Sequence, residues 1–125
     1  MEVKRRIMLG AFVLSSGYYD AYFEKAQKIR NLIKKEIEHL FEEVDIIALP
    51  ISMDYPWKIG DQKLDPVAIY LSDVFTVIAN LCGIPGISIP LARGENKMSS
   101  GLQLLSNSFQ EQDLFDLSAY LEIMA

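Results

Sequence analysis

Cysteine, histidine and tryptophan are nearly absent from this chain, because each occurs once in 125 residues. A single cysteine, Cys82, excludes an internal disulfide, and it is expected to be a small buried thiol. The only histidine, His39, lies in a charged stretch and is expected at the surface. A metal site or a catalytic triad needs partners that the sequence does not place around it, so we predict no metal site.

The sequence also lacks a membrane-length apolar run and a surplus of basic residues. Its longest apolar stretch, residues 7–14, is far shorter than the roughly 20 residues of a membrane span. No small-residue cleavage site follows that stretch, so we expect no signal peptide, no membrane association and a cytoplasmic protein. The net charge is −5, and residues 44–125 carry four Lys/Arg against ten Asp/Glu. This balance argues against direct binding of nucleic acid.

No complete catalytic motif is present. The chain contains neither a nucleophile elbow, nor a zinc-protease helix, nor a P-loop, nor a Cys-x-x-Cys pair. Two Ser-Ser-Gly runs, at residues 15–17 and 99–101, offer serines without a nearby base. Turn chemistry is the simpler interpretation of both runs.

What the sequence does contain is a regular alternation of helical and strand patterns. Residues 18–43 carry apolar side chains three or four positions apart, which is typical of one helical face, and residues 3–16 predict a helix buried on all sides. Short β-branched runs at 45–49, 86–89 and 101–106 predict strands. Residues 67–82 and a segment after a capping box at Ser108 and Glu111 predict two more helices, and Gly83 is expected to cap the first of them. The fold class is therefore α/β, in the order α-α-β-α-β-β-α.

The predicted elements do not make a self-sufficient domain. Three strands are few for a complete sheet, and two of the helices are apolar nearly all round. We expect residues 1–125 to form a single partial domain of something larger, with apolar surface that favours self-association. The proline-rich stretch 50–66 is expected to be a long loop, held to the body by Trp57.

Asp73 is the first candidate site residue. Together with Thr76 and Asn80 it forms a narrow polar stripe on the otherwise apolar 67–82 helix. An ionised carboxylate buried without a partner costs several kcal/mol, so Asp73 is expected to face a cation or a wet cavity. An internal ion pair or a helix cap is the alternative interpretation.

Arg6 is the second candidate. It follows Lys4 and Arg5 at the start of a predicted helix, where the positive end of the helix dipole disfavours cations. Arg6 also adjoins the apolar run and is the cation best placed to point inward. A basic flank in solvent is the alternative.

Three segments resemble the C-terminal part of the amidase signature family, and within it the glutaminase subunits of glutamyl-tRNA(Gln) amidotransferases. They read EVKRRIMLGAFVLSSGYYDAYFEKAQKIRNLIKKE, LCGIPGISIP and GLQLL. The resemblance covers essentially the whole chain, and the KRRIMLG…LSSGYYDAY block is specific to this kind of subunit. It implies the C-terminal portion of an amidase-signature fold.

The resemblance also implies an activity for the parent protein. Such glutaminase subunits hydrolyse glutamine and pass ammonia to the B subunit of the complex, where Glu-tRNA(Gln) is activated with ATP and Mg²⁺, while the C subunit joins the two. Related bacterial enzymes also amidate Asp-tRNA(Asn). The nucleophilic serine, the cis-serine and the lysine base of the family lie upstream. The chain is therefore expected to hold no catalytic residue and no cofactor, to be inactive alone, and to meet tRNA only through the complex.

By the same resemblance, Arg6 and Asp73 match the residues that bind the α-carboxylate and the α-amino group of glutamine. The LCGIPGISIP segment resembles a hinge into a central strand, in which Ser88 is a strand residue rather than a nucleophile. Two departures from the family pattern concern the rim of the site: residues 49–52 read Leu-Pro-Ile-Ser, and Ser72 stands where Asn is frequent. Two other interpretations stay open, a piece of an amidase acting on a different amide and a non-catalytic interaction module.

Overall fold

The computed structural model describes residues 2–15, 17–53, 60, 71–93 and 99–124. The predicted class and element order are confirmed. In chain order the elements are α1 (Glu2–Val13), the π-helical η1 (Tyr19–Glu24), α2 (Lys25–Leu40), β1 (Ile46–Pro50), α4 (Val77–Cys82), β2 (Gly86–Arg93), β3 (Ser99–Ser106) and α5 (Glu111–Met124). Trp57 and most of the predicted 50–66 loop lie outside the described residues.

The three described strands form one antiparallel sheet in the order β1-β3-β2. Ile47 lies opposite Leu105, and Ile87 lies opposite Leu104. Among the described strands, β3 pairs with both neighbours and β2 lies at an edge, so the central place that the resemblance implies for the 86–89 strand in the parent sheet stays a prediction. Since β3 is the only strand paired on both sides here, its side chains are the most buried of the sheet.

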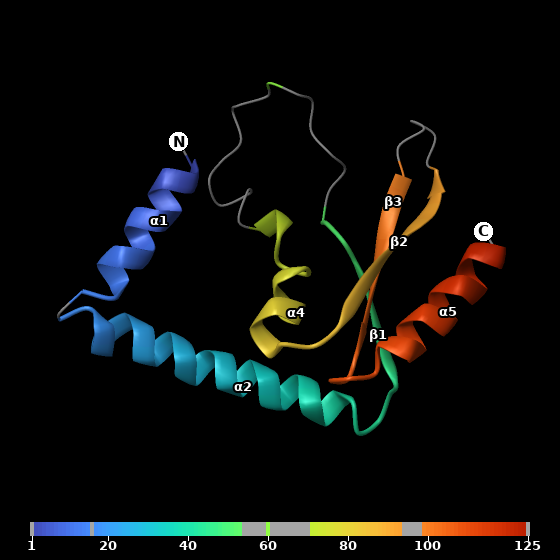
Figure 1. Ribbon diagram of the computed structural model, residues 1–125, viewed down its shortest axis with the longest axis horizontal. Coiled ribbons are helices and arrows are strands. Elements are labelled where there is room, and N and C mark those ends of the chain that lie inside the picture. Colours follow the sequence, from blue (N-terminus) through green and yellow to red (C-terminus); the bar gives the residue numbers. More distant parts are fainter. Residues whose placement is uncertain (1, 16, 54–59, 61–70, 94–98, 125) are drawn as a thin grey trace.

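Side chains alternate along β3 and divide the core between the two faces of the sheet. Leu104 packs with Ile89 of β2 and Leu114 of α5 on one face. Leu105 packs with Cys82 and Ile84 on the other face, where α2 and α4 complete the cluster. Figure 1 shows this layering, with α5 on one side of the strands and α4 on the other.

The long helical prediction over residues 18–43 is confirmed, although its first turns are π-helical. The predicted charge pairs both form on its exposed side, Lys28 with Glu24 at 3.9 Å and Lys34 with Glu38 at 3.7 Å. Ile33, Ile37 and Phe41, near the C-terminal end of this apolar face, pack against the core cluster formed by Cys82, Ile84 and Leu105. The N-terminal part of α2 extends beyond the sheet (Figure 1).

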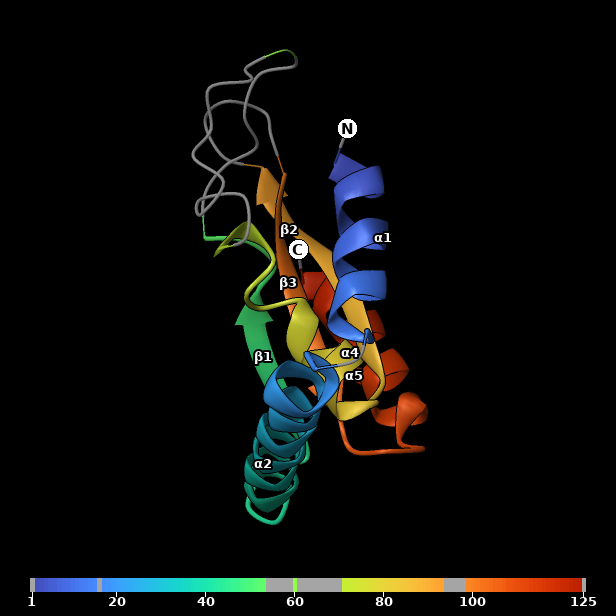
Figure 2. The same ribbon diagram turned by 90° about the vertical axis from the view of Figure 1, so that its left-hand side faces the viewer.

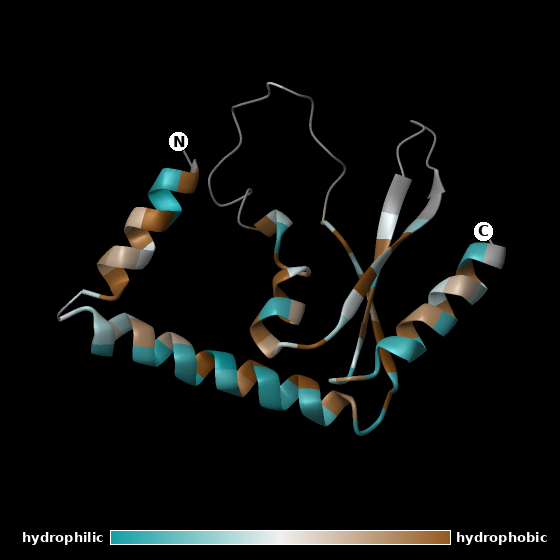
Figure 3. Cartoon of the chain, in the orientation of Figure 1, coloured by the Kyte–Doolittle hydropathy of each residue, from teal (hydrophilic) through white to brown (hydrophobic). Residues whose placement is uncertain are grey.

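The predicted burial of the first helix is wrong. Helix α1 forms, but its apolar side chains are exposed, with Ile7 at 68% and Met8 at 71%. It joins η1 through a cluster of rings in which the ring centroids of Phe12 and Tyr18 lie 4.2 Å apart. Figure 1 shows α1 standing away from the sheet, and Figure 3 colours most of α1 as hydrophobic after a hydrophilic turn near its start. The helical propensity of its residues and its contacts with η1 therefore account for α1. No described element packs over its exposed apolar side chains.

Two predicted helix ends have different outcomes. Gly83 caps α4 as expected, with φ 69° and a 2.8 Å hydrogen bond from its N–H to the carbonyl of Ala79. The prediction of a capping box at Ser108 and Glu111 is wrong. Ser108 would have to stand directly before the helix, but α5 begins only at Glu111. Phe109 adopts a left-handed conformation (φ 64°), which breaks the helical path before Glu111. Within the described residues, no helix combines the length and apolarity needed to cross a bilayer.

Candidate functional site

Asp73 lies in a turn that precedes α4, not in the middle of a helix. Its carbonyl accepts hydrogen bonds from the Val77 N–H at 3.0 Å and from the Thr76 hydroxyl at 3.1 Å. The prediction of one helix over 67–82 is therefore wrong in its described part, because residues 73–76 form turns and the regular helix begins at Val77. These two bonds anchor the backbone of Asp73 to the first turn of α4.

The polar stripe around Asp73 also differs from the prediction. The hydroxyl of Thr76 donates a hydrogen bond to the backbone carbonyl of Asp73, and Asn80 is exposed on α4. Asp73 is an exposed residue, and the expectation that it faces a cation or a wet cavity stays a prediction. Desolvation does not force a partner on Asp73 here, and its side chain is available to a ligand from solvent.

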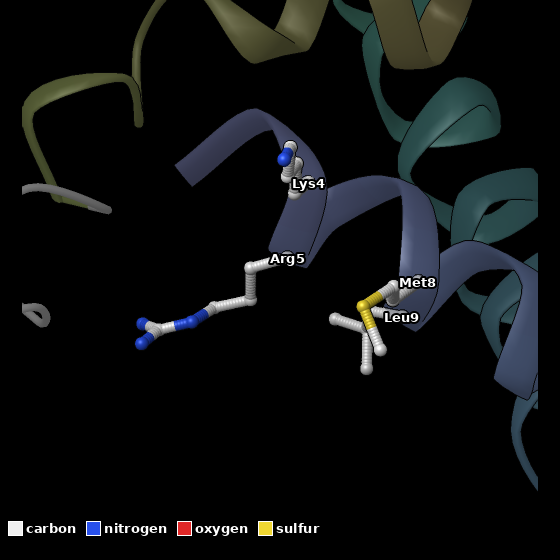
Figure 4. A pocket seen from close by; sticks show the side chains of 4 residues that line it. All are labelled: Lys4, Arg5, Met8 and Leu9. Carbon is white, nitrogen blue, oxygen red and sulfur yellow. The ribbon is translucent and has the colours of Figure 1, made fainter. Parts of the chain in front are cut away.

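Arg6 lies on α1, and its side chain is exposed. The same helix carries a shallow hollow of about 410 Å³, lined by Lys4, Arg5, Met8 and Leu9. Figure 4 shows that all four side chains come from one helix and that Arg5 extends away from it. Among the described residues, the lining of this hollow comes from α1 alone, so this part of it is a helix surface.

Arg6 lies on α1, and Asp73 lies in the turn that precedes α4. Figures 1 and 2 both show the ribbon of α1 running apart from the segment that begins at Leu71 and leads into α4. The two candidates thus come from separate elements. Their joint role in one site stays a prediction.

Two side chains that sequence reasoning missed hold α4 and the turn before it. The amide of Gln103 on β3 donates to the carbonyl of Phe75 at 3.2 Å. The Nε of Arg30 on α2 donates to the carbonyl of Leu81 at 2.7 Å. The signal for the first was a single polar residue inside the apolar run Leu-Gln-Leu-Leu, at positions 102–105. The second had no signal in the sequence, because its partner is a backbone carbonyl distant along the chain.

The described serines that the sequence singled out lie in strands or in a turn. Ser88 is a strand residue of β2, as predicted. Ser15 donates to the carbonyl of Phe12 at 2.6 Å, which fits the predicted turn, whereas Ser99 and Ser100 lie in β3 rather than in a turn.

The lone cysteine and histidine also lie where the sequence predicted. Burial raises the pKa of the Cys82 thiol, which is 3% exposed. His39 is exposed at the end of α2, with Nδ1 2.9 Å from a carboxylate oxygen of Glu42. Among the described residues, no group of three or more His, Cys, Asp or Glu side chains is placed to hold a metal ion.

Comparison with known proteins gives a consistent result. The Amidase family model matches residues 1–115. The chain is 49% identical over 121 residues to the second glutamyl-tRNA(Gln) amidotransferase A-type subunit of Clostridium acetobutylicum, covering 97% of this chain and 25% of that protein. It is 50% identical over 121 residues to the A-type subunit of the same enzyme from Sulfurimonas denitrificans, covering 97% of this chain and 27% of that protein. It spans about a quarter of the length of these curated relatives.

Solved structures agree with the sequence comparisons. The crystal structure of the glutamyl-tRNA(Gln) amidotransferase A-type subunit from Thermotoga maritima superposes with a TM-score of 0.70 and 44% identity, over 87% of this chain and 24% of that one. A crystal structure described as an amidase superposes with a TM-score of 0.75 over 99% of this chain and 29% of that one. Its identity is only 22%, so this second likeness concerns the fold.

Proposed function

Since the chain belongs to the amidase family, we propose that it forms the C-terminal, glutamine-recognising part of a glutaminase subunit of glutamyl-tRNA(Gln) amidotransferase. The observation that carries the proposal is the identity of 49–50% to such subunits over 97% of this chain. The superposition at 44% identity on the Thermotoga maritima protein supports it. The parent protein then releases ammonia from glutamine for the conversion of Glu-tRNA(Gln) to Gln-tRNA(Gln).

In this proposal the chain contributes recognition rather than bond cleavage. Arg6 reads the α-carboxylate of glutamine, because a guanidinium matches a carboxylate with two parallel hydrogen bonds. Asp73 reads the α-ammonium, and its exposed carboxylate is accessible for that role. The serine, cis-serine and lysine of the reaction come from outside the chain, and ATP and Mg²⁺ act at the B subunit. The complex with the B and C subunits works in the cytoplasm.

A chimera tests the proposal. Residues 1–125 replace the matching segment of the Thermotoga maritima glutaminase subunit, and the product is assembled with the other subunits of that enzyme. We expect both glutamine-dependent and ammonia-dependent formation of Gln-tRNA(Gln). As a matched control, the corresponding segment of the 22%-identical amidase is inserted in the same way, and it should support only the ammonia-dependent reaction.

Two outcomes contradict the proposal. If the folded chimera used ammonia but not glutamine, the chain would not recognise glutamine. If it hydrolysed simple amides that lack α-amino and α-carboxyl groups as well as it hydrolyses glutamine, the chain would belong to an amidase of another specificity. The isolated chain is expected to release no glutamate from glutamine, and release by a highly purified sample would refute the assignment of catalysis to residues outside it.

A further inference from the structure

Gln103 is a buried polar side chain on the most buried strand of the sheet. It is 5% exposed and lies between Leu102 and Leu104, which face α5. By the alternation of β3 it shares the opposite face with Leu105, the face that α4 covers. A buried amide without a hydrogen-bond partner destabilises a protein by about 1–3 kcal/mol. The group that accepts a hydrogen bond from the Gln103 amide therefore indicates why a polar residue stands in this apolar environment.

That partner lies in the turn that carries Asp73. The amide of Gln103 donates to the carbonyl of Phe75, two residues after Asp73. The carbonyl of Asp73 is in turn held by Val77 and Thr76 of the same segment. The local bonds fix the turn to α4, and the bond from Gln103 fixes it to the sheet.

The far end of α4 is held independently. Arg30 of α2 donates to the carbonyl of Leu81, and Gly83 ends the helix in a left-handed conformation. Helix α4 has only six residues, so a bond at each end governs its position. Release of the Phe75 carbonyl would leave the end that carries Asp73 less constrained than the end held by Arg30.

We propose that Gln103 is a positioning residue for glutamine recognition, which acts by fixing the turn that presents Asp73. The inference rests on the function proposed above and deepens it. Gln103 touches no substrate; it determines where the carboxylate of Asp73 stands relative to the sheet. Its loss should therefore affect the use of glutamine and spare the chemistry that follows ammonia release.

The test is Gln103→Met in the chimera, because methionine keeps the volume of the side chain and removes the donor. We expect glutamine KM to rise about 3- to 10-fold, the range that the loss of one neutral hydrogen bond allows. The ammonia-dependent rate should stay within about twofold of the parent. The matched control is Gln112→Met, which removes an amide that bonds to Asp116 on the exposed face of α5, and it should change neither value.

A double-mutant cycle with Asp73→Asn separates positioning from general support. If Gln103 acts through Asp73, Gln103→Met should add less than about twofold to the glutamine KM of Asp73→Asn. Independent, multiplicative effects of the two substitutions would overturn the proposal. Equal losses of the glutamine-dependent and ammonia-dependent reactions would do the same, because they would show that Gln103 only stabilises the fold.

Hydrogen exchange keeps the inference testable if the chimera shows no glutamine-dependent activity and the proposed function itself fails. The N–H of Val77 reports on the turn, because it bonds to the carbonyl of Asp73. In the folded chimera, Gln103→Met should speed its exchange about 3- to 10-fold while Gln112→Met leaves it unchanged. Unchanged exchange at Val77 in Gln103→Met would overturn the positioning role whatever the activity of the protein.

Discussion

At the scale of single residues, Asp73 is the residue whose substitution gives the most specific functional prediction. In the parent protein, Asp73→Asn keeps the shape of the side chain and removes its charge. We expect glutamine kcat/KM to fall about 10- to 150-fold, because a charge-assisted hydrogen bond contributes roughly 1.5–3 kcal/mol. Steady-state kinetics with glutamine and with ammonia measures the effect. The ammonia-dependent reaction bypasses the glutamine pocket and should survive.

Two further variants define what this result means. Arg6→Lys should behave like Asp73→Asn, because lysine loses the two-pronged contact with a carboxylate. Asp45→Asn removes another exposed carboxylate, just before β1, and should leave glutamine kinetics unchanged. If Asp73→Asn had no effect, or impaired the ammonia-dependent reaction equally, Asp73 would have a structural role and the site assignment would be wrong.

Cys82 gives a prediction on pH dependence. Burial raises the pKa of its thiol above the ordinary value of 9.0; the carboxylate of Glu38 acts in the same direction, and Lys34 and Arg30 oppose it. The unfolded chain therefore ionises at lower pH than the folded chain. The stability contributed by the neutral thiol is complete below about pH 9 and is lost as pH rises through the folded pKa.

The measurement is the free energy of unfolding by urea between pH 7 and pH 10, in the unsubstituted chain of 125 residues and in its Cys82→Ala variant. We expect the stability difference between the two proteins to shrink above about pH 9. The alanine variant controls for tyrosines and lysines that titrate in the same range. A difference that stayed constant to pH 10 would show that the thiol does not ionise with a shifted pKa.

At the scale of elements, Gly83 links the candidate turn and its helix to the sheet. It ends α4 with φ 69°, and a Cβ added there would meet no atom within 4 Å. The cost of Gly83→Ala is therefore conformational alone, about 1 kcal/mol of unfolding free energy. Gly10→Ala is the matched control, because Gly10 lies inside α1 with open space around it. That substitution should stabilise the helix by about 0.5–1 kcal/mol.

Urea unfolding of the two variants beside the parent gives the result. Opposite signs at the two glycines would support the left-handed cap as the reason for Gly83. Equal effects at both positions would contradict it.

The elements also show which features local sequence specifies. The charge pairs, the strand at 101–106 and the cap at Gly83 follow from periodicity and from the conformational freedom of glycine, so they were predictable. The break at residues 73–76 was not, because it accompanies a bond from Gln103, which is distant in sequence. Asp73 was found because one charge in an apolar run is conspicuous. Its exposure and the separate location of Arg6 depend on tertiary packing, which spacing does not encode.

At the scale of the whole molecule, the main feature is apolar surface without cover. Val3, Ile7 and Met8 are 68–71% exposed on α1, and Tyr22 of η1 and Leu32 of α2 are exposed as well. Figure 3 colours most of α1 as hydrophobic, whereas hydrophilic and hydrophobic residues alternate along α2. Exposed apolar patches above roughly several hundred Å² are uncommon on monomers and favour association. Net charge opposes this only weakly, because residues 1–43 are close to neutral.

We therefore predict that the chain by itself self-associates at micromolar concentration through α1. Sedimentation velocity across a concentration series should show species larger than the 14.2 kDa monomer. Ile7→Glu combined with Met8→Lys keeps the net charge and removes two of the most exposed apolar side chains, so it should shift the distribution toward monomer. Phe109→Asn is the control: Phe109 is 95% exposed but precedes α5, and asparagine tolerates its left-handed backbone. If the parent chain stayed monomeric, or Phe109→Asn reduced association as much as the α1 variant, the exposed face of α1 would not be the contact.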